Sequence, residues 1–176
     1  SFDVIILASE NPEIIKTGRF QRPGQPARLF MSQMPPEYEG GIGQEGVDAL
    51  KAFVEAGGIL VTLNQAGELA MNDLGAPARN SLSGVDRNKF FCPVSILRLK
   101  VDNATPLGYG LDEATAALFN QSLALDTWAP ASSKMDRKVV AYYPEDNILL
   151  SGWLLGEDYL SRKAAVVDVK NGKGHI

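Results

Sequence analysis

Apolar side chains recur every three or four residues between positions 47 and 54, which predicts a helix with one apolar face. The residues that set this spacing are Val47, Leu50, Phe53 and Val54. Gly57 and Gly58 are expected to end the helix, because glycine adopts the left-handed C-terminal conformation without a steric penalty from a Cβ atom. The apolar, β-branched run Ile59–Leu63 follows, and it is typical of a parallel-sheet strand that is buried on both faces.

The turn Asn64–Gly67 connects this strand to a second helical pattern over Glu68–Leu74. Near the start of the chain, Phe2–Leu7 is another apolar run, and we expect Ile5–Leu7 to lie parallel beside Ile59–Leu63. Strand, helix, strand, tight turn and helix in this order are typical of a βαβ protein. Ligands of such proteins usually bind beyond the carboxyl ends of the strands, so the turn is the first candidate binding position.

The rest of the chain reads as loops and short elements. Prolines interrupt residues 8–40, so we expect this stretch to be mostly irregular. Ser95–Val101 alternates apolar and polar side chains, as a half-exposed strand does. Asp112 is expected to cap a short helix over Glu113–Phe119. The last third contains a hairpin signal at Asn171–Gly174. Its strand candidates are Leu123–Trp128, Arg137–Tyr143, Ile148–Trp153 and Ala164–Val169.

The composition indicates one globular domain. The chain has 176 residues, of which 45% are hydrophobic, and this is enough for a sizeable core. A formal net charge of -4 gives no electrostatic reason to expect nucleic-acid binding, and no apolar run is long enough to span a bilayer. The single Cys92 and the single His175 argue against a disulfide framework, a catalytic triad and a zinc site. We therefore expect no metal, no cofactor and no catalytic residue in this chain.

Residues 41–46 match the letters of the GxGxxG dinucleotide-binding fingerprint. The fingerprint requires a strand before it and an acidic residue after the next strand, but prolines precede the motif here and Asn64 replaces the acid. Two interpretations remain, which are a flexible loop that leads into the helix and a nest of backbone amides that binds an anion. The candidate ligand-binding residues are accordingly Gly41, Gly43, Asn64, Gln65 and Gly67.

Cys92 is the one candidate nucleophile, and it follows two phenylalanines and precedes Pro93. A catalytic thiol needs a neighbouring base and a lowered pKa, which helix N-termini commonly supply. A strand pattern follows Cys92 instead, so a structural cysteine in the core or in a loop is favoured. An enzyme of unrecognised type that uses Cys92 stays open as an alternative.

Three segments together resemble the class I glutamine amidotransferase-like fold, namely FDVIIL, EGVDALKAFVEAGGILVTLNQAGELA and AAVVDVKNGKGHI. The resemblance implies a flavodoxin-like, three-layer α/β/α sandwich with a mainly parallel sheet, here with a β-rich C-terminal third. In catalytic relatives a G-x-C-x-G-like turn after a strand carries the nucleophilic cysteine. Gln65 stands at that cysteine position and Leu63 at the first glycine, so the resemblance implies the fold and argues against the reaction.

A narrower resemblance is to the C-terminal region of large bacterial exported zinc carboxypeptidases of the carboxypeptidase A-like family. The similar segments are PPEYEGGIGQEGVDALKAFVEAGGILVTL, FFCPVSILRLKVDNATPLGYG and LLSGWLLGEDYLSRKAAVVDVKNGKGHI. This resemblance implies a secreted or periplasmic protein and an adjacent peptidase domain on the same polypeptide. Any zinc would be held in that separate domain, because its H-x-x-E motif does not occur in this chain.

We therefore expect one amidotransferase-like domain over residues 1–176, as a fragment of a larger protein. Its expected function is that of a non-catalytic accessory domain with an interaction or stabilising role. The alternative is a domain that binds a small molecule, a peptide or a glycan through the Gly41–Gly46 loop and the Asn64–Gly67 turn.

Overall fold

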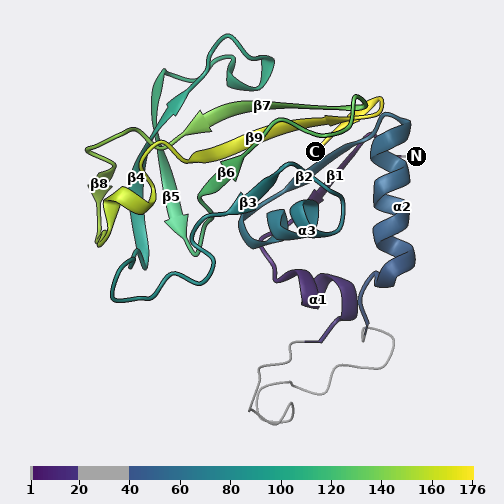
Figure 1. Ribbon diagram of the computed structural model, residues 1–176, viewed down its shortest axis with the longest axis horizontal. Coiled ribbons are helices and arrows are strands. Elements are labelled where there is room, and N and C mark those ends of the chain that lie inside the picture. Colours follow the sequence, from purple (N-terminus) through teal and green to yellow (C-terminus); the bar gives the residue numbers. More distant parts are fainter. Residues whose placement is uncertain (1, 20–39) are drawn as a thin grey trace.

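The computed structural model describes residues 2–19 and 40–176, and within these ranges ten strands form one mixed, curled sheet. The chain is sheet-rich, with 34% of its residues in strands and 23% in helices. The three helices gather at one end of the molecule around β1 and β2, and β4, β5 and β8 lie at the other end (Figure 1). The expected three-layer α/β/α, flavodoxin-like sandwich with a mainly parallel sheet is therefore wrong.

The main path of the sheet follows the order β1-β2-β10-β9-β7-β4-β5. The strands are β1 (Val4–Leu7), β2 (Ile59–Thr62), β3 (Ala78–Asn80), β4 (Val94–Val101), β5 (Ala114–Asn120), β6 (Leu125–Thr127), β7 (Met135–Tyr142), β8 (Leu149–Ser151), β9 (Ala164–Asn171) and β10 (Gly174–His175). The helices are α1 (Pro12–Thr17), α2 (Gly43–Ala56) and α3 (Gly67–Asn72), with 3-10 turns η2 (Asn64–Ala66), η3 (Pro106–Gly108) and η4 (Glu157–Tyr159). The strands predicted in the last third and the one at residues 95–101 are confirmed, with small differences at their ends.

The predicted parallel pair is confirmed, since β1 and β2 run side by side in parallel register from Val4↔Ile59 to Leu7↔Thr62. The predicted helix is α2, and it ends at Gly57, whose φ of 124° is the conformation that glycine favours. All three helices cover the same face of the β1–β2 pair. The core under them is built from Val47, Val54, Leu60, Leu69 and Leu74, with Ile5, Leu7 and Ile15 packed against it.

The hairpin β9–β10 joins this parallel pair to the antiparallel strands. His175 pairs with Lys170 of β9 on one side and with Ile59 of β2 on the other. Gly174 lies directly against the α2–β2 turn, where a Cβ atom would overlap the carbonyl oxygens of Val54 and Gly58. The predicted hairpin turn is thus confirmed, and its glycine allows two backbones to meet.

A second core lies between the antiparallel strands and the loops that cover them. Its fully buried side chains include Leu97 of β4, Ile148 and Leu160. Tyr143 is buried there as well, and its hydroxyl donates to the carbonyl oxygen of Leu123 at 3.0 Å. The described residues thus form a helix-covered core and an antiparallel core, with a third, smaller cluster of Ala70, Ala76 and Val169.

The helix expected at residues 113–119 is wrong, because residues 114–120 form strand β5. β5 pairs with β4 over seven residues in antiparallel register, from Lys100↔Ala114 to Val94↔Asn120. Alanine-rich sequence favours a helix locally, but the ladder with β4 and the burial of Phe119 outweigh that preference. Residues 8–40 are also not wholly irregular, since α1 lies within them, and positions 20–39 are outside the described residues.

β2 is buried on one face only, which corrects the expectation of burial on both. Leu60 is 1% exposed beneath the helices, whereas Ile59 and Val61 on the other face are 42% and 36% exposed. The physical reason is that no helix of the described chain crosses to this side. The residues that follow α3 form antiparallel strands instead.

Leu60→Asp is expected to lower the free energy of unfolding by more than about 3 kcal/mol, because it places a charge in the helix-covered core. Val61→Asp, its sequence neighbour on the exposed face, is expected to cost about 1 kcal/mol or less. Urea denaturation of the two variants measures the difference. Equal losses of stability would contradict the one-sided burial of β2.

Candidate functional site

The turn Asn64–Gly67 lies beyond the carboxyl end of β2, where the sequence places a binding site. Asn64 adopts a positive φ of 47°, which asparagine tolerates better than most residues. The amide of Ala66 donates to the carbonyl of Leu63, and the amide of Gly67 donates to the carbonyls of Asn64 and Gln65. These amides are therefore used within the turn and are not directed at an anion.

The side chain of Gln65 ties this turn to the connection between β5 and β6. Its Nε2 atom donates to Oε1 of Gln121 at 3.0 Å. Gly67 packs in the same region, since a Cβ atom there would lie 3.3 Å from Cδ1 of Leu123. Both residues thus have structural partners, and the turn acts as a joint between the helical end and the antiparallel strands.

The glycines of the 41–46 motif also have a structural explanation. Gly41 lies against the backbone of Lys16 and Thr17 at the end of α1, where a Cβ atom would overlap main-chain atoms. The amide of Ile42 donates to the carbonyl of Ile15 at 2.9 Å. Gly43 has a φ of 61° and begins α2. The motif is a close junction between two helices and gives no sign of a phosphate cradle.

The structure places both candidate regions at the same end of the β1–β2 pair. In parallel strands the carboxyl ends share one edge, and the helix α2 returns to β2 from that edge. The short helix α1 contacts both α2 and the 3-10 turn η2. The candidate residues Gly41, Gly43, Asn64, Gln65 and Gly67 are thus neighbours in the topology, but no described interaction gives them a shared ligand-binding role.

Cys92 lies in the antiparallel core and is 8% exposed. Burial raises the pKa of its thiol, and a hydrogen bond with Ser95 lowers that pKa by less. Burial also raises the pKa of the Tyr143 hydroxyl, with a smaller contribution from the charge of Cys92. The single histidine, His175, is in the other half of the sheet, with its Nδ1 atom 2.8 Å from Oδ1 of Asp168. This environment disfavours a reactive thiolate.

An open polar hollow of about 390 Å³, which the sequence gives no signal for, lies beside α3 and β3. Two of its charged side chains, Arg79 and Asp126, form an ion pair with each other. Asp126 accepts from Lys163 at 2.6 Å and from Arg79 at 3.0 Å, while Glu68 accepts from Asn80 at 3.1 Å. The hydrogen bond from Lys163 is the main cause of the lowered pKa of Asp126, burial opposes it, and Arg79 adds to it. The hollow therefore presents one carboxylate, Glu68, whose described partner is a neutral amide and not a cation.

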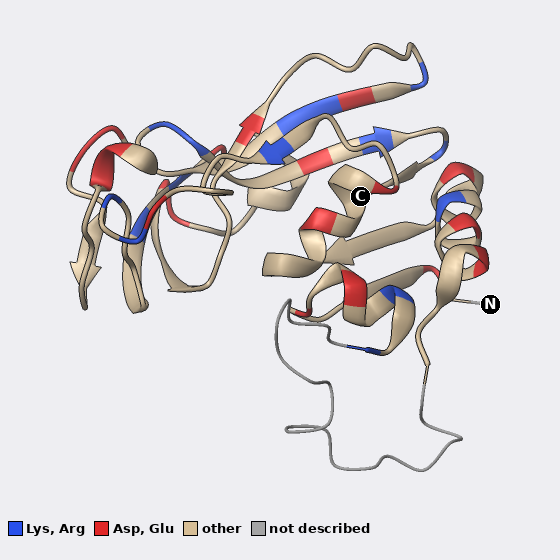
Figure 2. Cartoon of the chain, turned by 60° about the horizontal axis from the view of Figure 1, so that its bottom comes forward, with Lys and Arg blue, Asp and Glu red and all other residues tan. Residues whose placement is uncertain are grey.

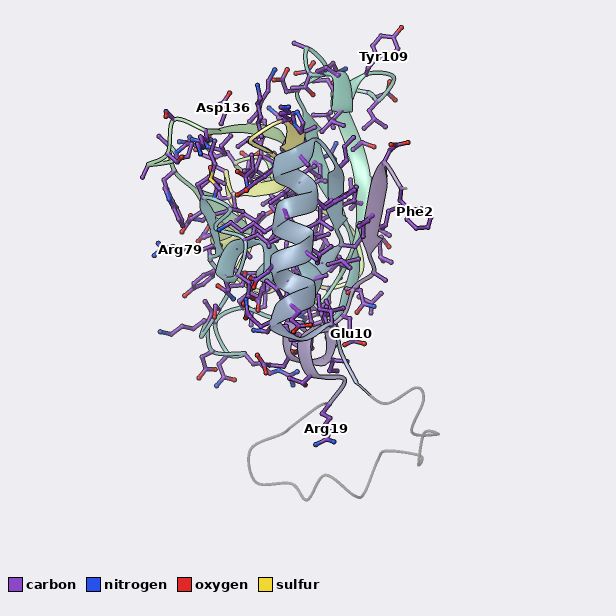
Figure 3. The ribbon with its side chains drawn as sticks, turned by 90° about the vertical axis from the view of Figure 1, so that its right-hand side faces the viewer. Phe2, Glu10, Arg19, Arg79, Tyr109 and Asp136 are labelled. Carbon is purple, nitrogen blue, oxygen red and sulfur yellow. The ribbon has the colours of Figure 1, made fainter. Side chains whose placement is uncertain are left out.

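An exposed apolar surface lies on the side of β1 and β2 that faces away from the helices. We call it the bare face, and its six apolar residues are Phe2 (82% exposed), Val4 (46%), Ile6 (64%), Ile59 (42%), Val61 (36%) and Leu63 (47%). Register partners in a parallel pair point to the same side, so Val4 lies beside Ile59 and Ile6 beside Val61. Phe2 projects sideways, away from α2 and from the sheet (Figure 3).

Parallel strands are normally covered on both faces, so this exposed apolar surface is a candidate interaction site. The sequence does not predict this exposed face, because β1 and β2 show no alternation of apolar and polar residues. The residues on the covered face, such as Ile5 and Leu60, are equally apolar. Helices cover one side of both strands, and the described chain supplies nothing for the other.

The described residues contain no group of three or more histidine, cysteine, aspartate or glutamate side chains that could hold a metal ion. The same part of the chain has no helix that is long and apolar enough to cross a membrane. Comparisons with protein-family models, with curated proteins and with solved structures find no match. The mixed, sheet-rich fold overturns the flavodoxin-like assignment, and no comparison supports the amidotransferase or peptidase assignments.

Cys92 is expected to react slowly with a thiol reagent in the native protein and rapidly after denaturation, because it is buried and its thiol pKa is raised. The matched variant Cys92→Ser/Gln65→Cys moves the only thiol to the turn after β2, and we expect fast labelling there in the native state. Absorbance with Ellman's reagent measures both rates. Fast labelling of native Cys92 would restore it as a candidate nucleophile.

Asp126→Asn is expected to lower the free energy of unfolding by about 1 kcal/mol at pH 7, because it breaks the ion pairs with Lys163 and Arg79. The folded-state pKa of Asp126 is lowered, so this stabilisation is present above the ordinary pKa of about 3.9 and is lost as pH falls through the folded value. Urea denaturation between pH 7 and pH 3 should show the difference shrinking with acid. Glu145→Gln, in the exposed pair with Arg162, is the control and should change stability little at any pH.

Proposed function

We propose that this chain is a non-catalytic interaction module that docks against another protein through the bare face. The observation that carries the proposal is the exposure of six apolar side chains, four on the adjacent parallel strands β1 and β2 and two directly beside them, whose opposite face packs against the helices. An exposed contiguous apolar surface costs free energy in water, and a partner that covers it recovers that cost.

The charge distribution supports the same conclusion. Residues on the bare face carry no charge, whereas β7 and β9 of the same sheet carry both basic and acidic residues (Figure 2). The exposed surface of β7 and β9 is therefore suited to contact with water, whereas the exposed bare face is apolar.

The catalytic alternative has weaker support. Cys92 is buried without a histidine beside it, and its thiol pKa is raised. The small-molecule alternative is weaker for a different reason, because Gln65 has a protein partner and the glycines at 41 and 67 are explained by close packing. The separate zinc-binding peptidase domain and the secreted or periplasmic location rest on the resemblance alone and stay untested.

The interaction module predicts that the native chain binds the apolar dye ANS at the bare face. The variant Ile6→Lys/Val61→Glu replaces two register partners with an opposite-charge pair, which leaves the net charge unchanged and should preserve the fold. We expect it to lose most of the native ANS fluorescence while its circular dichroism and melting temperature stay close to those of the wild type.

The control for the dye experiment is Leu118→Gln, which removes an exposed leucine from β5 in the other half of the sheet. It should leave the ANS signal unchanged. Equal fluorescence in all three proteins, or no native-state fluorescence at all, would mean that the bare face is not a recognition surface.

A further inference from the structure

We infer that the polar hollow beside α3 and β3 is a binding site for a neutral, hydroxyl-rich ring, such as one unit of a glycan. The inference goes beyond the proposed function, because none of the residues that line the hollow belongs to the bare face. The hollow is also separate from the turn Asn64–Gly67, since its lining comes from α3, from β3 with the loop after it, and from β6. These three elements lie next to one another (Figure 1).

The hollow has the size and the lining of a site for a small polar ligand. Its volume of about 390 Å³ is near the lower end of the about 300–1,000 Å³ that small-ligand sites occupy. Met71 is the only apolar side chain among the residues that line it. An apolar ligand would remove water from the other side chains without replacing its hydrogen bonds, so the fitting ligand is itself polar.

The charges at the hollow cancel, which favours a ligand without charge. Glu68 and Asp126 are acidic, whereas Arg79 and Lys163 are basic, so the four side chains sum to zero. Lys163 is outside the lining but forms an ion pair with Asp126. No net charge is left to attract a phosphate or an amine, and a neutral ligand needs none.

The ion pair of Arg79 and Asp126 holds one wall of the hollow in place. Nε and Nη2 of Arg79 donate to Oδ2 of Asp126 at 3.2 and 3.0 Å, while Nζ of Lys163 donates to Oδ1 at 2.6 Å. Nη1 of Arg79 has no described partner, and the side chain projects from the surface of the molecule (Figure 3). A guanidinium fixed in this way can donate to a ligand hydroxyl with little further ordering of the side chain.

The opposite wall offers acceptors and donors together. Nδ2 of Asn80 donates to Oε1 of Glu68 at 3.1 Å, and Oδ1 of Asn80 accepts from the amide of Leu82 at 3.0 Å. These bonds orient the Glu68 carboxylate and leave its Oε2 atom without a described partner. The side chains of Asn72 and Ser83, which also line the hollow, have no described hydrogen bond. A hydroxyl group both donates and accepts, so a ligand with several hydroxyls satisfies this mixed set.

An exposed aromatic ring stands on the same side of the sheet as the hollow. Trp128 is 48% exposed and follows β6, two positions after Asp126 and thus about 6.6 Å along the strand. Its amide donates to the carbonyl of Pro77 at 3.2 Å, so the antiparallel pairing of β3 and β6 continues to this residue. Alternation therefore directs Trp128 to the side of Asp126 and Arg79. A sugar ring has an apolar C–H face that packs on such an indole, which an inorganic ion does not.

The test is a titration of the isotope-labelled full chain with neutral disaccharides, followed by amide chemical shifts. The probes are maltose, cellobiose, lactose and N,N′-diacetylchitobiose, with inorganic phosphate and glucosamine as charged probes. We expect at least one neutral disaccharide to shift the amides of residues 68–72, 79–83 and 126–128 in a saturable way. The charged probes should shift them little.

Two variants locate the sugar. Glu68→Gln removes the charge that strengthens a hydrogen bond from a hydroxyl, and Trp128→Ala removes the aromatic surface. Each is expected to weaken binding by about fivefold or more while the melting temperature stays close to that of the wild type. Trp153→Ala, which removes the other exposed tryptophan, is the matched control and should leave the affinity unchanged.

Three outcomes would overturn the inference. The first is the absence of a saturable shift with every neutral disaccharide. The second is a shift with phosphate or glucosamine alone, which would make the hollow an ion site. The third is saccharide binding that neither Glu68→Gln nor Trp128→Ala weakens, because the sugar would then bind elsewhere. None of these outcomes bears on the bare face, and Ile6→Lys/Val61→Glu should bind the saccharide as the wild type does.

Discussion

The insertion of the two-residue strand β10 between β2 and β9 is the contact on which the rest of the structure depends. It is short, but it connects a parallel pair to an antiparallel sheet through bonds on both edges. The amide of His175 donates to the carbonyl of Gly58, while Ile176 and Val169 exchange two backbone bonds of 2.9 and 2.8 Å. This junction requires that Gly174 has no side chain, because the carbonyls of Val54 and Gly58 occupy the space of a Cβ atom. The parallel pair is thereby fixed as one end of a larger sheet.

That junction also decides which faces are covered. The three helices are all close to β1 and β2 in sequence, and they pack on the side where Leu60 and Ile176 point. After α3, the chain continues into β3 and the antiparallel strands, which extend the sheet sideways and add no second layer. The apolar residues on the far side of β1 and β2 are a consequence of this topology. Because these side chains stay largely in water, they add little to the stability of the isolated chain, and that side can gain free energy when a partner covers it.

The sequence predicts what depends on local patterns and misses what depends on distant contacts. Helical spacing identified α2, the glycines at 57 and 174 marked real changes of direction, and the apolar runs identified the parallel pair. Residues 113–119 were misassigned because their local preference is helical, while their strand state depends on pairing with β4, whose partner residues from Lys100↔Ala114 to Val94↔Asn120 are 14 to 26 positions away. The two-sided burial of β2 was wrong because a continuous apolar run carries no periodicity that says which face is covered.

The candidate site shows the same limit at the level of single residues. A glycine is needed wherever a backbone approaches another group closely, and the sequence does not say whether that group is a phosphate or a second main chain. At Gly41 it is the backbone of α1, so the letters of a nucleotide-binding motif describe a helix junction. The residues of the bare face show the converse case. The sequence predicts that they form strands, but it does not predict that they are exposed. Whether a side chain is buried in the core or exposed to a ligand therefore depends on tertiary contacts with distant segments of the chain. On one sheet, Val61 and Lys138 both lie on solvent-facing surfaces, one apolar and one charged, because helices cover only one side of β2.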